Sequence, residues 1–162
     1  MSTEIRAAVI TVSDACARGE RKDESGEELV RLINELGGQI VSRQIVPDDI
    51  EPLAHALKSQ ADLSDVNLVI TTGGTGFGPR DNTPEATRMI IEREAPGLSE
   101  AMRAESLKHT PMGMISRGVC GLRSNCLVVN LPGSPKAVRE SFAVIQVVLP
   151  HVVNLLAGQT KH

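Results

Sequence analysis

Apolar and polar positions along this chain follow two different periods in turn. Continuous apolar runs rich in β-branched residues predict buried strands at residues 5–12, 39–46, 66–70, 119–122 and 126–130. Apolar residues at helical spacing predict helices at residues 25–36, 50–63, 83–94, 98–108 and 135–156. Ser25 is the expected cap of the first helix, and the polar stretch at 13–24 is expected to be a loop.

This alternation of strands and helices is typical of an α/β fold, with a doubly wound, mostly parallel sheet and helices on both faces. The last two predicted strands are separated only by residues 123–125, so we expect a short hairpin near 118–130. A length of 162 residues suits one domain, and no linker, repeat or low-complexity stretch divides it. Residues 1–162 are therefore expected to form a single domain. Ligands of such sheets bind outside the carboxyl ends of the strands.

A glycine-rich loop occupies residues 71–84, with the sequence Thr-Thr-Gly-Gly-Thr-Gly-Phe-Gly-Pro-Arg-Asp-Asn-Thr-Pro. Its glycines leave backbone N–H groups uncovered, and such groups beside a helix N-terminus favour phosphate. A long flexible turn is the alternative. A P-loop is excluded because Pro79 and Arg80 replace the required Lys-Ser/Thr. A dinucleotide fingerprint fails because Pro79 or Asp81 stands where a small residue is needed.

Polar residues also follow the other strands that are predicted to be parallel. They lie at 11–14 (Thr-Val-Ser-Asp), 46–48 (Val-Pro-Asp) and 130–136 (Asn-Leu-Pro-Gly-Ser-Pro-Lys). Because carboxyl ends of parallel strands share one edge of a sheet, these segments are expected to meet the glycine loop there. Lys136 would oppose the dipole of the helix that it begins, so a bound phosphate explains this lysine better.

Composition narrows the classes of partner. A net charge of −3 and two aromatic residues argue against a nucleic-acid partner. No apolar stretch is long enough to cross a membrane, and the first residues lack the apolar segment of a signal peptide. We therefore expect a cytoplasmic protein with no membrane partner. The odd count of three cysteines without a C-x-x-C pair fits reduced thiols, and four scattered histidines lack metal-ligand spacing.

The four polar segments together resemble the signature of one family. The glycine loop, the Arg-Asp-x-Thr-Pro-Glu-Ala that ends it, and the segments at 11–14, 46–48 and 130–136 are similar to those of the molybdenum cofactor biosynthesis family. This family includes bacterial molybdopterin adenylyltransferases, their MoaB-type relatives and the gephyrin G domain. The resemblance implies transfer of AMP from Mg-ATP to the phosphate of molybdopterin. It also implies a homotrimer and contact with a downstream protein that inserts the metal.

The resemblance also implies roles for individual residues. Asp48 and Asp81 would be the catalytic pair and the ligands of Mg²⁺, which prefers one or two carboxylates together with phosphates and water. Arg80 and Arg117 are further candidate phosphate partners. Substrate or nucleotide would contact the loop residues at the strand ends, namely Ser13, Asp14, Thr72, Gly73, Gly74, Thr75, Gly76, Gly133, Ser134 and Lys136.

Structural roles remain open for several of these residues. Asp81 suits an N-terminal helix cap, Asp49 suits a cap for the helix at 50–63, and Asp14 suits a solvated loop. For the whole chain, the alternative to an enzyme is a binding or scaffold protein of the same fold that holds molybdopterin without transferring AMP. The presence of both Asp48 and Asp81 favours the enzyme.

Overall fold

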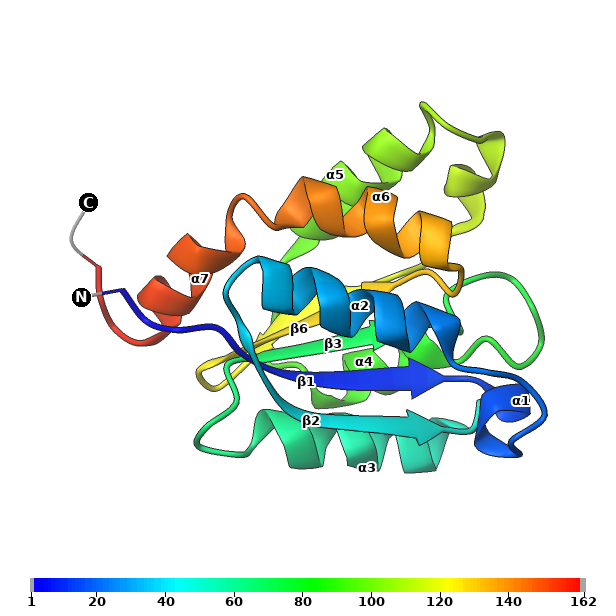
Figure 1. The fold of residues 1–162 in the computed structure, drawn as a ribbon, viewed down its shortest axis with the longest axis horizontal. Coiled ribbons are helices and arrows are strands. Elements are labelled where there is room, and N and C mark those ends of the chain that lie inside the picture. Colours follow the sequence, from blue (N-terminus) through cyan, green and yellow to red (C-terminus); the bar gives the residue numbers. More distant parts are fainter. Residues whose placement is uncertain (1, 161–162) are drawn as a thin grey trace.

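The computed structural model describes residues 2–160 and shows a six-stranded sheet between two layers of helices (Figure 1). The strands are β1 (Arg6–Val12), β2 (Gln39–Val46), β3 (Leu68–Thr72), β4 (Arg93–Glu94), β5 (Cys120–Arg123) and β6 (Cys126–Leu131). The helices are α1 (Asp14–Ala17), α2 (Glu24–Glu35), α3 (Ile50–Ala61), α4 (Thr83–Ile90), α5 (Pro96–Ser106), the 3₁₀ helix η1 (Pro111–Ile115), α6 (Pro135–Ile145) and α7 (Leu149–Leu156).

The strands are ordered β2-β1-β3-β6-β5-β4, so the chain goes outward from β1 to β2 and crosses back to β3, whereas its second half starts at the far edge with β4 and returns through β5 to β6 beside β3. The first four strands in this order are parallel, whereas β5 and β4 are antiparallel to their neighbours. Ser124, at φ 50°, turns the chain between β5 and β6 and confirms the predicted hairpin. The α/β, doubly wound prediction is confirmed.

Each face of the sheet carries its own hydrophobic core. Alternate residues of β1, such as Ala7 and Val9, pack under α2, α5, α6 and α7, together with the fully buried Phe142. The intervening residues of β1, such as Ala8 and Ile10, pack against α3 and α4 on the other face. Because strand side chains alternate between faces, a continuous apolar run is what a sheet covered on both sides requires.

Two predicted helix boundaries are wrong at the front of the chain. The stretch at 13–24 contains the short helix α1 as well as loop. The cap of α2 is Asp23 rather than Ser25, because the Asp23 carboxylate accepts the N–H of Gly26 at 3.0 Å. Ser25 lies inside the first turn, where its hydroxyl is not needed as a cap.

Three predictions in the second half also need correction. The predicted helix at 83–94 ends at Ile90, and residues 93–94 leave it to form β4 beside β5. The next helix starts at Pro96, since proline is tolerated in a first helical turn. The predicted single helix at 135–156 is two helices, α6 and α7. Pro150 has no N–H to donate to the preceding turn, and its ring would clash with that turn, so a continuous helix is interrupted.

Candidate functional site

The glycine loop leaves β3 through two residues with positive φ. Gly73 has φ 102° and Gly74 has φ 70°. A Cβ on Gly73 would lie 2.4 Å from the carbonyl oxygen of Val12, and one on Gly74 would lie 2.3 Å from Oγ1 of Thr83. Thr83 in turn donates its hydroxyl to the Gly73 carbonyl at 2.9 Å. The loop is therefore packed against its surroundings, which excludes the alternative of a loose, flexible turn at these positions.

Asp48 and Asp14 brace each other across two neighbouring strand ends. The Asp14 N–H donates to Oδ2 of Asp48 at 2.9 Å, and the Asp48 N–H donates to Oδ1 of Asp14 at 3.0 Å. Burial raises the pKa of the Asp48 carboxyl above its ordinary value, and the charges of Asp14 and Asp81 act in the same direction. Asp48 therefore lies in a negative, partly desolvated environment, which a bound cation would relieve.

Arg80 covers the outer side of this carboxylate pair. Its Nε and one terminal nitrogen donate to the two oxygens of Asp14 at 2.6 and 3.0 Å, and the same terminal nitrogen donates to Asp49 at 3.1 Å. The hydrogen bonds that Asp14 accepts from Arg80, with the one from the Asp48 N–H, lower the pKa of Asp14 to about 2. Asp14 therefore forms an ion pair with Arg80, and the alternative of a solvated loop carboxylate is wrong. Asp49 occupies the cap position of α3 but makes no capping hydrogen bond.

Asp81 does not cap α4, since the N-cap of that helix is Asn82. Instead Oδ2 of Asp81 accepts the N–H of Gly78 at 2.9 Å, inside the glycine loop. Arg117 fixes the same loop from the other side, donating to the carbonyls of Gly76 at 2.8 Å and Asp81 at 2.7 Å. The helix-cap alternative for Asp81 is therefore wrong, and its carboxylate belongs to the loop.

A second loop, residues 132–135, is tied directly to the glycine loop. The Thr72 hydroxyl donates to the Pro132 carbonyl at 2.7 Å, and a Cβ on Gly133 would lie 3.3 Å from the Cα of Gly73. Behind both loops, the buried Asn130 side chain donates to the hydroxyls of Thr71 and Thr87 at 3.2 and 2.9 Å. The carboxyl ends of β3 and β6 are thus held together as one rigid edge.

A polar cavity of about 210 Å³ opens at this edge. Acidic, hydroxyl and basic groups share its wall with the bare backbone of the two loops. The lining residues are Thr11, Val12, Ser13, Cys16, Arg21, Lys22, Glu24, Ser25, Asp48, Thr72, Gly73, Gly74, Asp81, Gly133 and Pro135.

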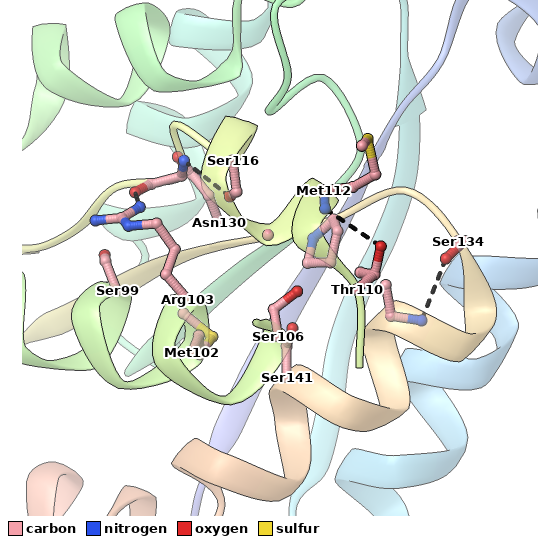
Figure 2. A pocket seen from close by; sticks show the side chains of 14 residues that line it. Ser99, Met102, Arg103, Ser106, Thr110, Met112, Ser116, Asn130, Ser134 and Ser141 are labelled. Atoms are coloured by element: carbon pink, nitrogen blue, oxygen red, sulfur yellow. Dashed lines mark hydrogen bonds between the residues drawn. The ribbon is translucent and has the colours of Figure 1, made fainter. Parts of the chain in front are cut away.

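A larger cavity of about 360 Å³ lies on the other side of the 132–135 loop, between α5, η1 and α6 (Figure 2). Ser134 and Pro132 line it, whereas Gly133 and Pro135 line the polar cavity. Five serines and two methionines contribute to its wall, namely Ser99, Ser106, Ser116, Ser134, Ser141, Met102 and Met112. The Ser99 hydroxyl is buried beside the Cys120 thiol and makes no hydrogen bond of normal geometry with a described residue.

The predicted site residues are only partly brought together. Ser13, Thr72, Gly73, Gly74, Gly133 and both predicted catalytic acids line the polar cavity, and Asp14 contacts one of those acids. Ser134 lines the larger cavity and caps α6 by accepting the N–H of Ala137. Thr75 and Gly76 instead hold Arg117 through their carbonyls. Lys136 lines neither cavity and faces Glu140 at 3.8 Å.

Sequence reasoning missed the basic and acidic wall formed by residues 21–25. Asp23 offered a signal, because an aspartate three residues before Gly26 is as good a capping pattern as Ser25. It also missed the larger cavity, whose walls come from three segments between residues 99 and 141 and carry no compact motif.

The donor set at the polar cavity fits a magnesium ion. No group of three or more His, Cys, Asp or Glu side chains in residues 2–160 is arranged to hold a metal by itself. Asp48 and Asp81 nevertheless each keep an Oδ1 that accepts no hydrogen bond from the described residues. Two carboxylate oxygens with phosphate and water completing the shell is the arrangement that Mg²⁺ prefers.

A doubly wound sheet with a glycine loop, bracing carboxylates and a polar cavity at its carboxyl edge defines an α/β protein of the class whose ligands bind at that edge. Residues 8–151 match the family model described as a probable molybdopterin binding domain. The chain belongs to this molybdenum cofactor biosynthesis family, as the motifs indicated.

Individual relatives agree with this assignment. The chain is 45% identical over 154 residues to the molybdenum cofactor synthesis protein cinnamon of Drosophila melanogaster, covering 94% of this chain but 26% of that protein. It is 36% identical to a molybdopterin adenylyltransferase of Helicobacter pylori, covering 95% of this chain and 89% of that one. The crystal structure of the molybdopterin biosynthesis enzyme MoaB of Thermus thermophilus matches with a TM-score of 0.89 and 43% identity, covering 95% and 97% of the two chains.

Proposed function

We propose that this protein is a molybdopterin adenylyltransferase. A terminal phosphate oxygen of molybdopterin attacks the α-phosphorus of ATP, the bond from that phosphorus to the bridging oxygen breaks, and pyrophosphate leaves with the electron pair. The products are adenylyl-molybdopterin and pyrophosphate. The names of relatives such as the Helicobacter pylori enzyme support the reaction.

One observation carries the proposal. Two cavities of different chemistry share the 132–135 loop as a common wall, with both predicted catalytic acids in the smaller one. The smaller, charged cavity suits the phosphates of ATP. The larger one, with serine hydroxyls and methionines, suits a flat heterocycle that carries hydrogen-bonding groups at its edge. On this assignment the molybdopterin phosphate reaches the shared loop, where the reacting groups meet.

The two acids are proposed to hold Mg²⁺ against the phosphates. Bound there, the ion would neutralise charge that develops on the phosphate oxygens as the bond to pyrophosphate breaks. The protein's own contribution is positional. The Asp14 N–H holds the Asp48 carboxylate in place, the Asp48 N–H holds the Asp14 carboxylate in return, and the Gly78 N–H and Arg117 hold the segment of Asp81.

The test measures pyrophosphate release when the purified protein is supplied with ATP, Mg²⁺ and molybdopterin. Asp81→Asn and Asp48→Ala should each lower turnover by about 100-fold or more, since each removes a charge that acts on the reacting phosphates. Asp48→Ala should impair ATP-dependent turnover more than molybdopterin binding. Asp49→Ala is the matched control, because Asp49 is adjacent and acidic but does not line the cavity.

Near-normal turnover of Asp81→Asn would contradict the catalytic role of Asp81 and leave it only the structural role of holding the glycine loop. A wild-type protein that binds molybdopterin but releases no pyrophosphate would favour the alternative, a binding or scaffold protein of the same fold. The intact pair of acids at the cavity favours the enzyme over this alternative.

We further propose that the protein acts as a homotrimer in the cytoplasm, as a single domain. Exposed apolar side chains, among them Met89, Met114 and Val147, give surface that a partner copy can cover. Among the described residues, no helix is long and apolar enough to cross a membrane. Light scattering should give three times the mass of one chain, and a monomer at micromolar concentration would contradict the trimer.

A further inference from the structure

The segment after α1, together with the first residues of α2, forms a wall of the polar cavity that the proposed roles do not use. Arg21, Lys22, Glu24 and Ser25 all line the cavity. They share this cavity with the predicted acids, and the segment that follows α1 lies at the carboxyl ends of β1 and β2 (Figure 1). The wall therefore brings two cations to a cavity whose opposing groups are carboxylates and bare backbone.

Asp23 anchors this wall to the sheet. Its Oδ2 accepts the Thr11 hydroxyl at 2.8 Å and a terminal nitrogen of Arg43 at 3.0 Å, while Oδ1 accepts the N–H of Gly26 at 3.0 Å. These partners come from β1, β2 and the first turn of α2. Asp23 is only 7% exposed, so its charge is compensated inside the fold rather than by solvent.

The packing around Asp23 leaves little freedom. A Cβ on Gly26 would lie 2.1 Å from Oδ2 of Asp23 and 2.5 Å from Oγ1 of Thr11. The backbone of α2 thus sits directly on the Asp23–Thr11 hydrogen bond. A segment fixed in this way presents its neighbouring side chains at a constant position on the cavity wall.

The two cations on the wall are free to bind a ligand. Within residues 2–160, Arg21 makes no ion pair and no side-chain hydrogen bond. Lys22 makes only an exposed pair with Glu27 at 3.5 Å, which contributes little. By contrast, Arg18 on the same segment is bound by both oxygens of Glu20 and does not line the cavity.

We propose that Arg21 and Lys22 bind the β- and γ-phosphates of the nucleotide, the part that leaves as pyrophosphate, and that Asp23 is the positioning residue for both. This inference rests on the proposed function and extends it. One Mg²⁺ held by the two acids leaves most of the triphosphate charge uncompensated, so further cations favour binding where pyrophosphate departs. Paired guanidinium and ammonium groups are the protein's usual partners for phosphate oxygens.

The test is calorimetric binding of pyrophosphate, ATP and AMP to the protein with Mg²⁺ and without molybdopterin. The double variant Arg21→Ala, Lys22→Ala should bind pyrophosphate and ATP about tenfold or more weakly, because two charge-assisted hydrogen bonds are lost. Affinity for AMP, which lacks those phosphates, should change less than about twofold. Arg18→Ala should bind all three ligands as the wild type does.

Asp23→Asn tests the positioning role, since the amide keeps the shape but loses the charge that holds Arg43. It should weaken pyrophosphate binding and leave AMP binding unchanged, which a general loss of fold would not do. Thr11→Val, which removes one hydrogen bond to Asp23, should weaken pyrophosphate binding by a smaller factor. It replaces Asp23→Asn as the test if that variant does not fold.

Unchanged pyrophosphate affinity in the double variant, or equal losses for pyrophosphate and AMP, would overturn the inference. AMP transfer by that same variant with normal pyrophosphate binding would leave the proposed function standing. Absent AMP transfer in the wild type would overturn the proposed function, whereas the phosphate contacts of Arg21 and Lys22 are tested separately by the binding measurements.

Discussion

Gly73→Ala offers a quantitative test of how tightly the glycine loop is packed. An alanine at φ 102° is strained by about 1–2 kcal/mol. Its Cβ would also lie 2.4 Å from the Val12 carbonyl oxygen, and relieving such an overlap with backbone costs about 1–3 kcal/mol more. The less flexible unfolded chain offsets about 0.4–1 kcal/mol. The expected loss is therefore about 1–5 kcal/mol in the free energy of unfolding.

Two glycines elsewhere separate these contributions. Gly19 has φ 73° but nothing within 4 Å of an added Cβ, so Gly19→Ala should show the strain of positive φ alone. Gly97 also has open space and no positive φ, and it lies in α5, so Gly97→Ala should be neutral or stabilising. Urea unfolding followed by circular dichroism measures all three variants. An equal loss for Gly73→Ala and Gly19→Ala would refute the steric part of the reasoning.

The same substitution should also lower AMP transfer in the molecules that remain folded. Gly133 approaches the Cα of Gly73 to within the reach of one methyl group, at 3.3 Å for an added Cβ. A displaced Gly73 would therefore move the loop that separates the two cavities. Pyrophosphate release measured well below the unfolding midpoint separates this effect from the loss of stability.

Two other predictions concern titratable groups that the proposed chemistry does not use. Burial raises the pKa of the Cys120 thiol and raises that of Cys126 to about 12. A thiol reagent at pH 8 should therefore modify only Cys16 in the folded protein, and all three cysteines in urea. A variant with Cys16→Ser, Cys120→Ala and Cys126→Ala should keep most AMP-transfer activity, and loss of that activity would reveal a thiol step. The Asp62 carboxyl, whose pKa is lowered by hydrogen bonds from Arg123, stabilises the fold above the ordinary Asp pKa, and that stabilisation should disappear as the pH falls through the lowered value. Asp62→Asn should therefore flatten the acid limb of the stability profile, and an unchanged limb would contradict the assignment.

The sequence predicted the parts of the fold that depend on local periodicity. The buried strands and the glycine loop were predicted correctly because each depends on a pattern of consecutive residues. The interruption between α6 and α7 was missed because Pro150 was outweighed by the apolar periodicity around it. The two-residue strand β4 was missed because it exists only through pairing with β5, which no local pattern records.

The candidate site was likewise predictable only where it depends on local sequence and on the rule that parallel strands end at one edge. Asp48 and the glycine loop share an edge because parallel strands end together, and that rule is readable from sequence. The role of Arg80 was not, since its partner Asp14 lies 66 residues away in the chain. The same holds for Asp23, whose partners Thr11 and Arg43 belong to two different strands.

The two ends of the described chain lie side by side (Figure 1). The N–H of Thr3 donates to the Asn154 side chain at 2.6 Å, and Gln159 donates to the Thr3 hydroxyl at 3.0 Å. This junction is at the amino edge of the sheet, opposite the two cavities. A polypeptide fused to either end would therefore emerge away from the site, and joining the ends by a short linker would leave the cavities unaltered. Such a module can be inserted whole into a longer protein, and in the cinnamon protein the stretch that matches this chain is 26% of a longer chain.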